Sequence, residues 1–215
     1  MLKKNKSLLP ALLLLAGFFV AGSCKEPNKN ITTKEITPSL SEPANPYAVV
    51  DKSPMDISYY PVNYPQQLMN KNDSAGLTAR VIYSRPQKMG RTIFSNEPPP
   101  KCIQQYGAYW RLGANEATEI EFFKEVHIQG KKIAKGRYII YCIPNPTQWM
   151  IIFNSNLFSF GLHQDTAQDI CKFEIPVQQT NDNIEFFTMV FQKSAIGADL
   201  IMTWGGIKAV LPIEF

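Results

Sequence analysis

The chain has 215 residues and a formal net charge of +4 at pH 7, from 22 Lys and Arg against 18 Asp and Glu. Three of the lysines, Lys3, Lys4 and Lys6, lie in a basic start of the chain, and without them the count of Lys and Arg falls from 22 to 19. A nucleic-acid-binding protein needs a clustered basic face, so this balance predicts no nucleic-acid partner.

Residues 1–23 are expected to be a secretory signal peptide. The basic start is followed by an apolar run, residues 8–20, and by the small residues Ala21-Gly22-Ser23. This run is too short for a membrane-spanning helix. The segment Val20-Ala21-Gly22-Ser23-Cys24 resembles a bacterial lipobox, which implies that Cys24 is lipidated before cleavage. The alternative is a plain signal peptide that happens to precede a cysteine.

Residues 24–52 are expected to be a lipid-anchored flexible tether. They are polar, and four prolines interrupt them, Pro27, Pro38, Pro43 and Pro46, which disfavours regular structure. Several acyl chains on one residue anchor a protein stably, because each buried CH2 contributes about 0.8 kcal/mol. We therefore expect a lipid-anchored protein of the bacterial cell envelope whose partner is a membrane. The expected location is the outer membrane, on its periplasmic or its surface side.

Residues 53–215 are expected to form a single domain, because their number is sufficient for a full hydrophobic core. Their apolar residues recur with the period of two that is typical of strands. One example is the face shared by Ile120, Phe122, Val126 and Ile128. Further runs rich in β-branched and aromatic residues lie at 77–84, 137–143, 149–153, 170–177, 184–193, 199–204 and 207–213.

Turn residues separate these runs, as in the segment 129–136, which has a glycine near each end. Residues 65–70 and 101–106 are each compatible with a single helical turn, and no longer amphipathic helix is predicted. This pattern predicts an all-β fold, an antiparallel β-sandwich or flattened barrel with long irregular loops. Its core is expected to contain the aromatic residues at alternating strand positions: Trp149, Phe153, Phe186, Phe191 and Trp204.

Three cysteines remain once Cys24 is lipidated: Cys102, Cys142 and Cys171. Cys142 lies in an apolar run and is expected to be a small buried side chain. Any pair among the three is compatible with an oxidising compartment. If a disulfide forms, we expect it between Cys102 and Cys171.

No metal site, cofactor or catalytic residue is predicted. The two histidines, His127 and His163, have no His or Cys partner at ligand spacing, and no nucleophile elbow, phosphate loop or dinucleotide fingerprint is present. Glu119 and Glu121 lie on one strand face with α-carbons roughly 7 Å apart, in the broad range of a glycosidase pair. A solvated strand face explains them more simply.

The densest group of directed hydrogen-bonding side chains lies in residues 110–118. With two arginines upstream, it gives six candidate ligand-binding residues: Arg85, Arg91, Trp110, Arg111, Asn115 and Glu116. One hypothesis is a pocket in which Trp110 stacks on a ligand and the arginines bind its anionic or polyol groups. The other, which we favour, is a structural plug in which Glu116 pairs with Arg91 or Arg111 inside the domain.

Two further features concern loops. The segment Phe158-Ser159-Phe160-Gly161 falls in a loop, where its aromatic rings either line a cleft or cap one end of the sandwich. Gly107 and Gly113 are expected to be turn residues that permit a positive φ.

Several long motifs of mixed chemistry follow one another along the domain: Tyr83-Ser84-Arg85-Pro86, Gly90-Arg91-Thr92-Ile93-Phe94, Trp110 to Thr118, Ile128-Gln129-Gly130-Lys131-Lys132 and Gly136-Arg137-Tyr138. In these motifs the chain resembles the bacterial family called Domain of Unknown Function 2911, over nearly all of residues 53–215. The resemblance implies an envelope location and this architecture, and it implies no reaction.

The leading hypothesis is a lipid-anchored cell-envelope protein of unestablished activity. It would act as a binding or structural module, with a small molecule or glycan as its ligand, and not as a catalyst. The alternative is a hydrolase of envelope carbohydrate that uses Glu116 and a second carboxylate, which requires both groups to be open to solvent in one cleft. A purely structural interaction domain would instead show an exposed apolar patch and no concave site.

Overall fold

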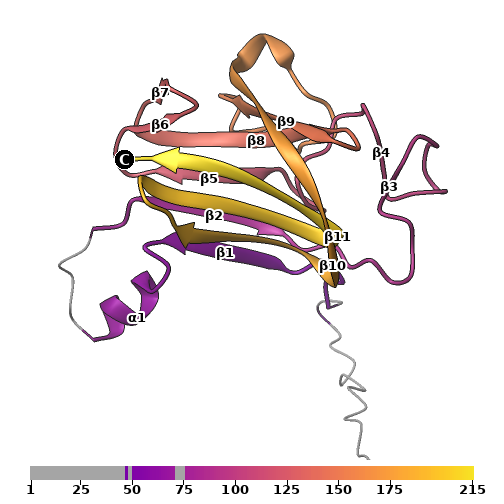
Figure 1. Ribbon diagram of the computed structural model, residues 1–215, viewed down its shortest axis with the longest axis horizontal. Helices are drawn as coiled ribbons and strands as arrows, with labels where there is room; N and C mark the ends of the chain where they lie inside the picture. Colours follow the sequence, from indigo (N-terminus) through magenta and orange to yellow (C-terminus); the bar gives the residue numbers. More distant parts are fainter. Residues whose placement is uncertain (1–46, 48–49, 71–75) are drawn as a thin grey trace, which may run out of the picture. The chain divides into compact units, whose positions relative to one another are not determined.

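The structure is a computed structural model that describes residues 47, 50–70 and 76–215. The expected signal peptide, Cys24 and most of the expected tether lie outside the described residues. The described residues belong to one compact unit, Tyr47–Phe215. Figure 1 shows that strands make up nearly all of this unit's regular secondary structure, which confirms the all-β prediction.

Nine strands form one sheet, in the order β1-β2-β5-β8-β9-β10-β11-β6-β7, and a short parallel pair, β3-β4, lies apart from it. The strands are β1 (Met55–Tyr60), β2 (Ala79–Ser84), β3 (Phe94–Ser95), β4 (Gln104–Gln105), β5 (Thr118–Phe122), β6 (Val126–Ile128), β7 (Lys131–Ile133), β8 (Gly136–Pro144), β9 (Gln148–Asn154), β10 (Asp169–Lys193) and β11 (Gly197–Glu214). The helix α1 (Tyr64–Met69) nearly coincides with the helical turn predicted at 65–70. Residues 101–106, the other predicted turn, form no helix and contain β4 instead.

The two longest strands bend the sheet around its core. β10 pairs with β9 through its first part and with β11 through the rest, and its register with β11 shifts on either side of Ile184. Such irregularities bend a strand and increase its twist. β11 doubles back, so that Gly197 at its start lies against Ile213 near its end. Because the end strands of the sheet, β1 and β7, are not neighbours, the sheet is folded over but not closed into a barrel (Figure 1).

The period of two in the sequence places one face of each strand in the core. Ile120, Phe122, Val126 and Ile128 are all fully buried, as their shared face predicts. A break at residues 123–125 divides them between β5 and β6. The four side chains are nevertheless buried together, because β5 and β6 both contribute to the same enclosed core.

A cluster of aromatic rings from distant parts of the chain fills the centre of the core. Trp110 stacks on Trp204, with ring centroids 6.0 Å apart and planes at 16°. It also contacts Trp149 and Phe187, at centroid distances of 5.6 and 4.9 Å. Phe94 contacts all three tryptophans. The cluster therefore holds β3 and Trp110 against the main sheet. Each pair of aromatic rings in contact contributes about 0.5–1.5 kcal/mol to stability, in addition to the burial of their surface.

Four of the five aromatic residues predicted in the core are buried there: Trp149, Phe153, Phe191 and Trp204. The prediction for Phe186 is wrong. Its side chain is only partly buried and lies over the Arg85 guanidinium, whereas Phe187 is fully buried. Phe187, Met189 and Phe191 alternate as the core face of this part of β10, which leaves Phe186 on the opposite face.

The three cysteines of the domain are buried and free: Cys102, Cys142 and Cys171. The bond between Cys102 and Cys171, which we expect if a disulfide forms, is not present, and the Cys102 thiol instead donates to the backbone oxygen of Glu97. Burial raises the pKa of Cys142 well above its usual value. That thiol stays protonated at neutral pH and behaves as the small buried side chain that the sequence predicts.

Candidate functional site

The segment 110–118 leaves the core as an irregular turn. Trp110 exchanges two backbone hydrogen bonds of 2.8 Å with Cys142 in β8. Leu112 and Asn115 then adopt positive φ values of 54° and 57°. A left-handed conformation costs a non-glycine residue roughly 1–2 kcal/mol and persists only where surrounding contacts enforce it, as happens at functional sites.

The two glycines of this region have different roles. Gly107 has a φ of +75°, as predicted. Gly113 does not adopt a positive φ, and the prediction for it is wrong. A glycine is required there for space, because a Cβ would lie 2.8 Å from the backbone oxygen of Ser84. The turn therefore packs closely on the end of β2.

A pocket of about 320 Å³ opens beside this turn, and we call it the arginine pocket. Its volume is in the range of small-molecule sites. It is lined by Ser53, Pro86, Arg91, Ile103, Gln104, Tyr109, Trp110, Arg111, Gly113, Ala114, Gly161 and Leu162. Three of the six candidate residues thus come together here, namely Arg91, Trp110 and Arg111.

Arg111 is held at the pocket by its own turn. Its Nη1 donates a hydrogen bond of 2.6 Å to the backbone oxygen of Asn115, and its guanidinium carbon lies 5.5 Å from the ring centroid of Phe160. The Asn115 side chain donates to Asp51 Oδ2 at 2.6 Å and to the backbone oxygen of Ser53 at 3.2 Å. Asn115 does not line the pocket. It positions Arg111 and ties the turn to the segment before β1.

Arg91 enters the same pocket from the connection between β2 and β3. Its Nε and Nη2 donate to the backbone oxygens of Lys88 and Gln87. A guanidinium carries five N–H donors in a planar fork, so Arg91 and Arg111 both keep donors beyond these backbone contacts. Those remaining donors are suited to bidentate binding of an oxyanion.

The charge of the arginine pocket is not compensated within the described part of the chain. Neither Arg91 nor Arg111 forms an ion pair with a described carboxylate. Burial lowers the pKa of Arg111, because desolvation disfavours its charged form. The group stays protonated, since the ordinary pKa of arginine is far above neutrality. The pocket therefore presents positive charge that favours an anionic group.

Trp110 forms a buried wall of this pocket. Its side chain is 5% exposed, and its Nε1 donates to the backbone oxygen of Gly113 at 3.2 Å. Because its ring is packed against Trp204 and Phe187, it is not free to stack on a ligand. That part of the pocket hypothesis is wrong.

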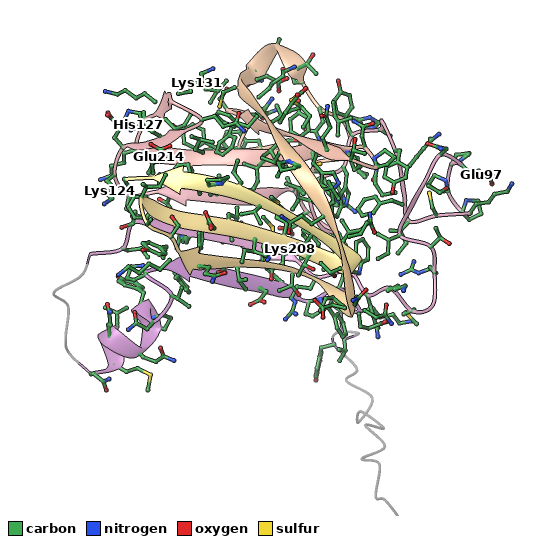
Figure 2. The ribbon with its side chains drawn as sticks, viewed as in Figure 1. Glu97, Lys124, His127, Lys131, Lys208 and Glu214 are labelled. Atoms are coloured by element: carbon green, nitrogen blue, oxygen red, sulfur yellow. The ribbon has the colours of Figure 1, made fainter. Side chains whose placement is uncertain are left out.

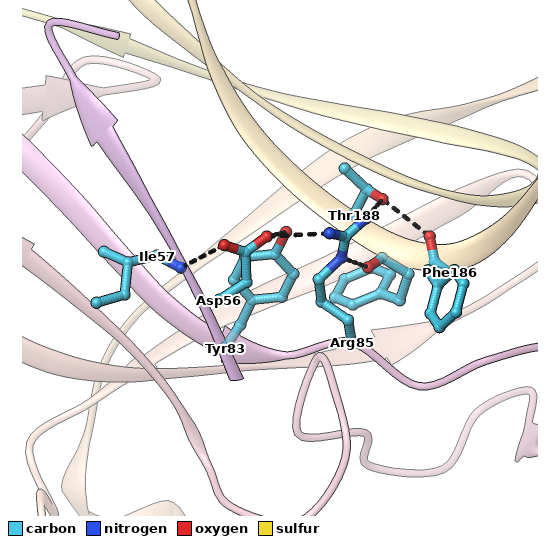
Figure 3. Close-up of polar contacts among 7 residues, drawn as sticks. Asp56, Ile57, Tyr83, Arg85, Phe186 and Thr188 are labelled. Carbon is cyan, nitrogen blue, oxygen red and sulfur yellow. Dashed lines mark hydrogen bonds and ion pairs between the residues drawn. The ribbon is translucent and has the colours of Figure 1, made fainter. Parts of the chain in front are cut away.

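Arg85 lies outside the arginine pocket and fastens three strands, as Figure 3 shows. Its Nη1 pairs with Asp56 in β1 at 3.3 Å, and its other nitrogens donate to the backbone oxygen of Phe187 and the hydroxyl of Thr188 in β10. Tyr83 donates to the same carboxylate; burial raises the pKa of Tyr83 to about 12, so it remains a donor at neutral pH. An arginine–carboxylate pair that joins strands therefore exists between Arg85 and Asp56, but both side chains are partly exposed, so it is not the buried plug that the sequence suggests.

Glu116 does not form the plug that we favour from the sequence. Its side chain is exposed, and it pairs with neither Arg91 nor Arg111. Arg111 instead donates one hydrogen bond to the backbone oxygen of Asn115. Glu116 and Glu119 line two further pockets together, of about 210 and 190 Å³.

The smaller of these we call the acidic pocket. It is lined by Glu116, Ala117, Glu119, Leu157, Phe158, Ser159 and Phe160. Glu119 forms an ion pair with Arg137 from β8, and this contact raises the pKa of Arg137. The uncompensated negative charge of the acidic pocket therefore belongs to Glu116.

The loop 155–165 borders both pockets. Its Gly161 has a φ of +88°, and a Cβ there would lie 2.9 Å from the Cβ of Arg111 and 3.1 Å from Ala117. The loop therefore packs closely on the 110–118 turn at this glycine. Of the two alternatives for Phe158 and its neighbours, the structure supports the one in which the loop lines clefts.

Several lining residues of the arginine pocket are absent from the candidates drawn from the sequence. Tyr109 is half-exposed and directly precedes Trp110, so its position in the chain is a signal that could have included it. Ser53 precedes β1, Gln104 lies in β4 and Leu162 lies in the loop after β9, and no spacing in the sequence indicates that they meet.

The histidines do not contribute to the arginine pocket. Figure 2 shows His127 near Glu214, at the end of the sheet formed by β6 and β7, and Glu97 on the opposite side of the view, in the segment between β3 and β4. Among the described residues, no group of three or more His, Cys, Asp or Glu could hold a metal ion. No helix in residues 50–70 and 76–215 is long and apolar enough to cross a membrane.

Comparison with known proteins identifies the family and nothing more. No curated protein and no solved structure matches the chain. The model of the family described as "Protein of unknown function (DUF2911)" matches residues 65–213, which include every strand from β2 to β10 and most of β11. Because this match covers most of the chain, the chain belongs to the DUF2911 family of proteins of unknown function.

Proposed function

We propose that this protein is a binding module of the bacterial cell envelope. Lipids on Cys24 would hold it to a membrane, and its arginine pocket would bind the anionic group of a small molecule. The observation that carries the proposal is the presence of Arg91 and Arg111 at one pocket without a described carboxylate partner.

Other arginines of the domain provide the contrast. Arg85 pairs with Asp56, and Arg80 pairs with Glu121 at 2.7 Å between neighbouring strands. Each of these two arginines joins neighbouring strands and has a carboxylate partner. Arg111 is partly buried and lacks one, which costs free energy. Such a cost is expected where a ligand supplies the missing charge.

The first test measures, by NMR titration, the binding of hexanoate, a simple alkyl carboxylate, to the full chain. We expect weak binding, with a Kd on the order of 1 mM, since one charge-assisted bidentate contact supplies only a few kcal/mol. Arg111→Met should weaken it about tenfold or more, because methionine keeps the bulk and removes the charge. Arg91→Met should have a smaller effect, because its side chain is exposed.

The matched control is Arg80→Met. Arg80 is paired with Glu121 and lines neither the arginine pocket nor the acidic pocket, so hexanoate binding should not change. If Arg111→Met binds hexanoate as tightly as the parent while melting at the same temperature, the pocket is not an anion site.

The anchor is proposed from Cys24 and from the apolar run before it. Cells that express the full chain should incorporate radioactive palmitate into it, and Cys24→Ala should abolish the label and release the protein from the membrane fraction. A parent chain that takes up no label, or a Cys24→Ala chain labelled equally, would show that no lipid is attached there.

A second candidate function is hydrolysis of envelope carbohydrate. It is favoured by Glu116 and Glu119 lining the same two pockets, neither of them buried. Against it, Glu119 is already engaged in an ion pair with Arg137, whereas such a mechanism needs both carboxyl groups to act on the sugar and its attacking water. Cleavage of 4-nitrophenyl glycosides that is lost in both Glu116→Gln and Glu119→Gln would establish the hydrolase in place of the binding module.

A further inference from the structure

We infer that the ligand is a zwitterion, with its anionic group in the arginine pocket and an alkylammonium group in the acidic pocket beside Glu116. This inference rests on the proposed function of the arginine pocket and specifies the ligand class. It follows from three observations: the two pockets adjoin, their uncompensated charges are opposite, and aromatic faces line the acidic one.

The two pockets adjoin across a single pair of side chains. Phe160 lines the acidic pocket, and Arg111 lines the arginine pocket. The guanidinium carbon of Arg111 lies 5.5 Å from the Phe160 ring centroid. The next residue, Gly161, lines the arginine pocket and packs on Arg111 and Ala117. A short flexible molecule can therefore reach from one pocket to the other over this pair.

The charges of the two pockets have opposite signs. Arg91 and Arg111 carry positive charge without a described carboxylate, and Glu116 is exposed without a described cationic partner. The turn keeps them apart, because Arg111 donates to the Asn115 backbone and not to Glu116. Opposite charges in adjoining pockets that do not neutralise one another favour a ligand that carries both signs.

The lining of the acidic pocket selects an organic cation. Phe158 is 99% exposed and Phe160 is 57% exposed, and the face of an aromatic ring is negative and attracts ammonium groups. A metal ion is not favoured, because no cluster of three ligating side chains exists among the described residues. The combination of Glu116 with ring faces matches the recognition of alkylammonium groups.

The experiment compares amino carboxylates of increasing length, to find the length that reaches both pockets at once. The full chain is titrated by NMR with 4-aminobutanoate, 5-aminopentanoate and 6-aminohexanoate, each beside the alkyl carboxylate of the same length. We expect at least one amino carboxylate to bind about tenfold tighter than its alkyl counterpart, because the second contact is made within one complex. Phosphocholine, compared with phosphate and with choline, shows whether the anionic group is a carboxylate or a phosphate.

Three variants assign the effect to residues. Glu116→Gln should remove the advantage of the amino carboxylate and leave alkyl carboxylate binding unchanged, and Phe158→Ala should reduce that advantage severalfold. Glu121→Gln is the matched control, since Glu121 pairs with Arg80 and lines neither pocket. All three side chains are at least partly exposed, so folding is retained.

The outcomes separate the two proposals. If zwitterions and their singly charged counterparts bind equally at every length and for both anionic groups, the zwitterion inference is overturned, while Arg111-dependent alkyl carboxylate binding still supports the proposed function. The inference is also overturned if Glu116→Gln leaves the advantage intact. If neither class of ligand binds in an Arg111-dependent way, the arginine pocket itself is not the site.

Discussion

Replacement of Trp110 by alanine is expected to lower the free energy of unfolding by about 3–5 kcal/mol, the usual range when a buried tryptophan is removed from a core. The ring is 5% exposed and contacts four other aromatic rings: Phe94, Trp149, Phe187 and Trp204. It also lies at the junction of the 110–118 turn and β8. Its loss therefore leaves a cavity and loosens the wall of the arginine pocket.

The measurement is chemical denaturation together with the melting temperature. One kcal/mol corresponds to roughly 2–4 °C for a domain of this size, so a fall of about 10 °C is expected. Phe158→Ala is the matched aromatic control, because Phe158 is 99% exposed, and its loss should change stability by about 0.5 kcal/mol or less. A cost below about 1 kcal/mol for Trp110→Ala would mean that the ring is not part of the core, and would restore the hypothesis that it stacks on a ligand.

The strands that alternate regularly could be predicted from the sequence, and the irregular ones could not. The face of Ile120 and Phe122 follows from a period of two, which reports burial on one side of a sheet. β3 and β4 have two residues each, too few to show any period. β10 is divided in the sequence by the polar stretch 178–183, yet its backbone remains a strand around the bend.

The types of side chain in the candidate site were easier to predict than which of them form pairs. An arginine–carboxylate pair is present, but Arg85 meets Asp56 from β1 at a partly exposed position. In β1 the apolar residues Met55 and Ile57 face solvent, so the alternation there does not indicate the core face. The expected partner, Glu116, is near Arg111 in the chain, yet the left-handed residue Asn115 directs the guanidinium to a backbone oxygen. Proximity in sequence does not determine pairing when the backbone between the two groups turns.

The loops supply the part of the site that depends on tertiary packing. The loop 155–165 reaches the arginine pocket because Gly161 leaves room for Arg111 and Ala117. A glycine in a loop is compatible with many geometries, and only the packed structure shows which neighbour requires its missing side chain. The aromatic residues of this loop are therefore visible in the sequence, while their relation to the arginines is not.

Gly197→Ala is expected to be the most damaging single-methyl change in the fold. A Cβ at this position would lie 2.2 Å from the backbone oxygen of Ile213 and 3.1 Å from the Cα of Glu214. Both are backbone atoms, so no side-chain rotation relieves the contact. The Gly197 oxygen also accepts a hydrogen bond from the Tyr60 hydroxyl at 3.1 Å, so β1 and both ends of β11 meet here. Overpacking usually costs about 1–3 kcal/mol, and we expect about 3 kcal/mol or more.

The matched control is Gly76→Ala, because no atom of the described residues lies within 4 Å of a Cβ built there. Alanine at such a site restricts the unfolded chain without straining the folded one, so stability should be unchanged or rise by about 0.4–1 kcal/mol. Urea denaturation of both variants measures the difference. If Gly197→Ala unfolds at the same urea concentration as Gly76→Ala, the two ends of β11 are not in contact, and the doubling back that closes this end of the core does not occur in solution.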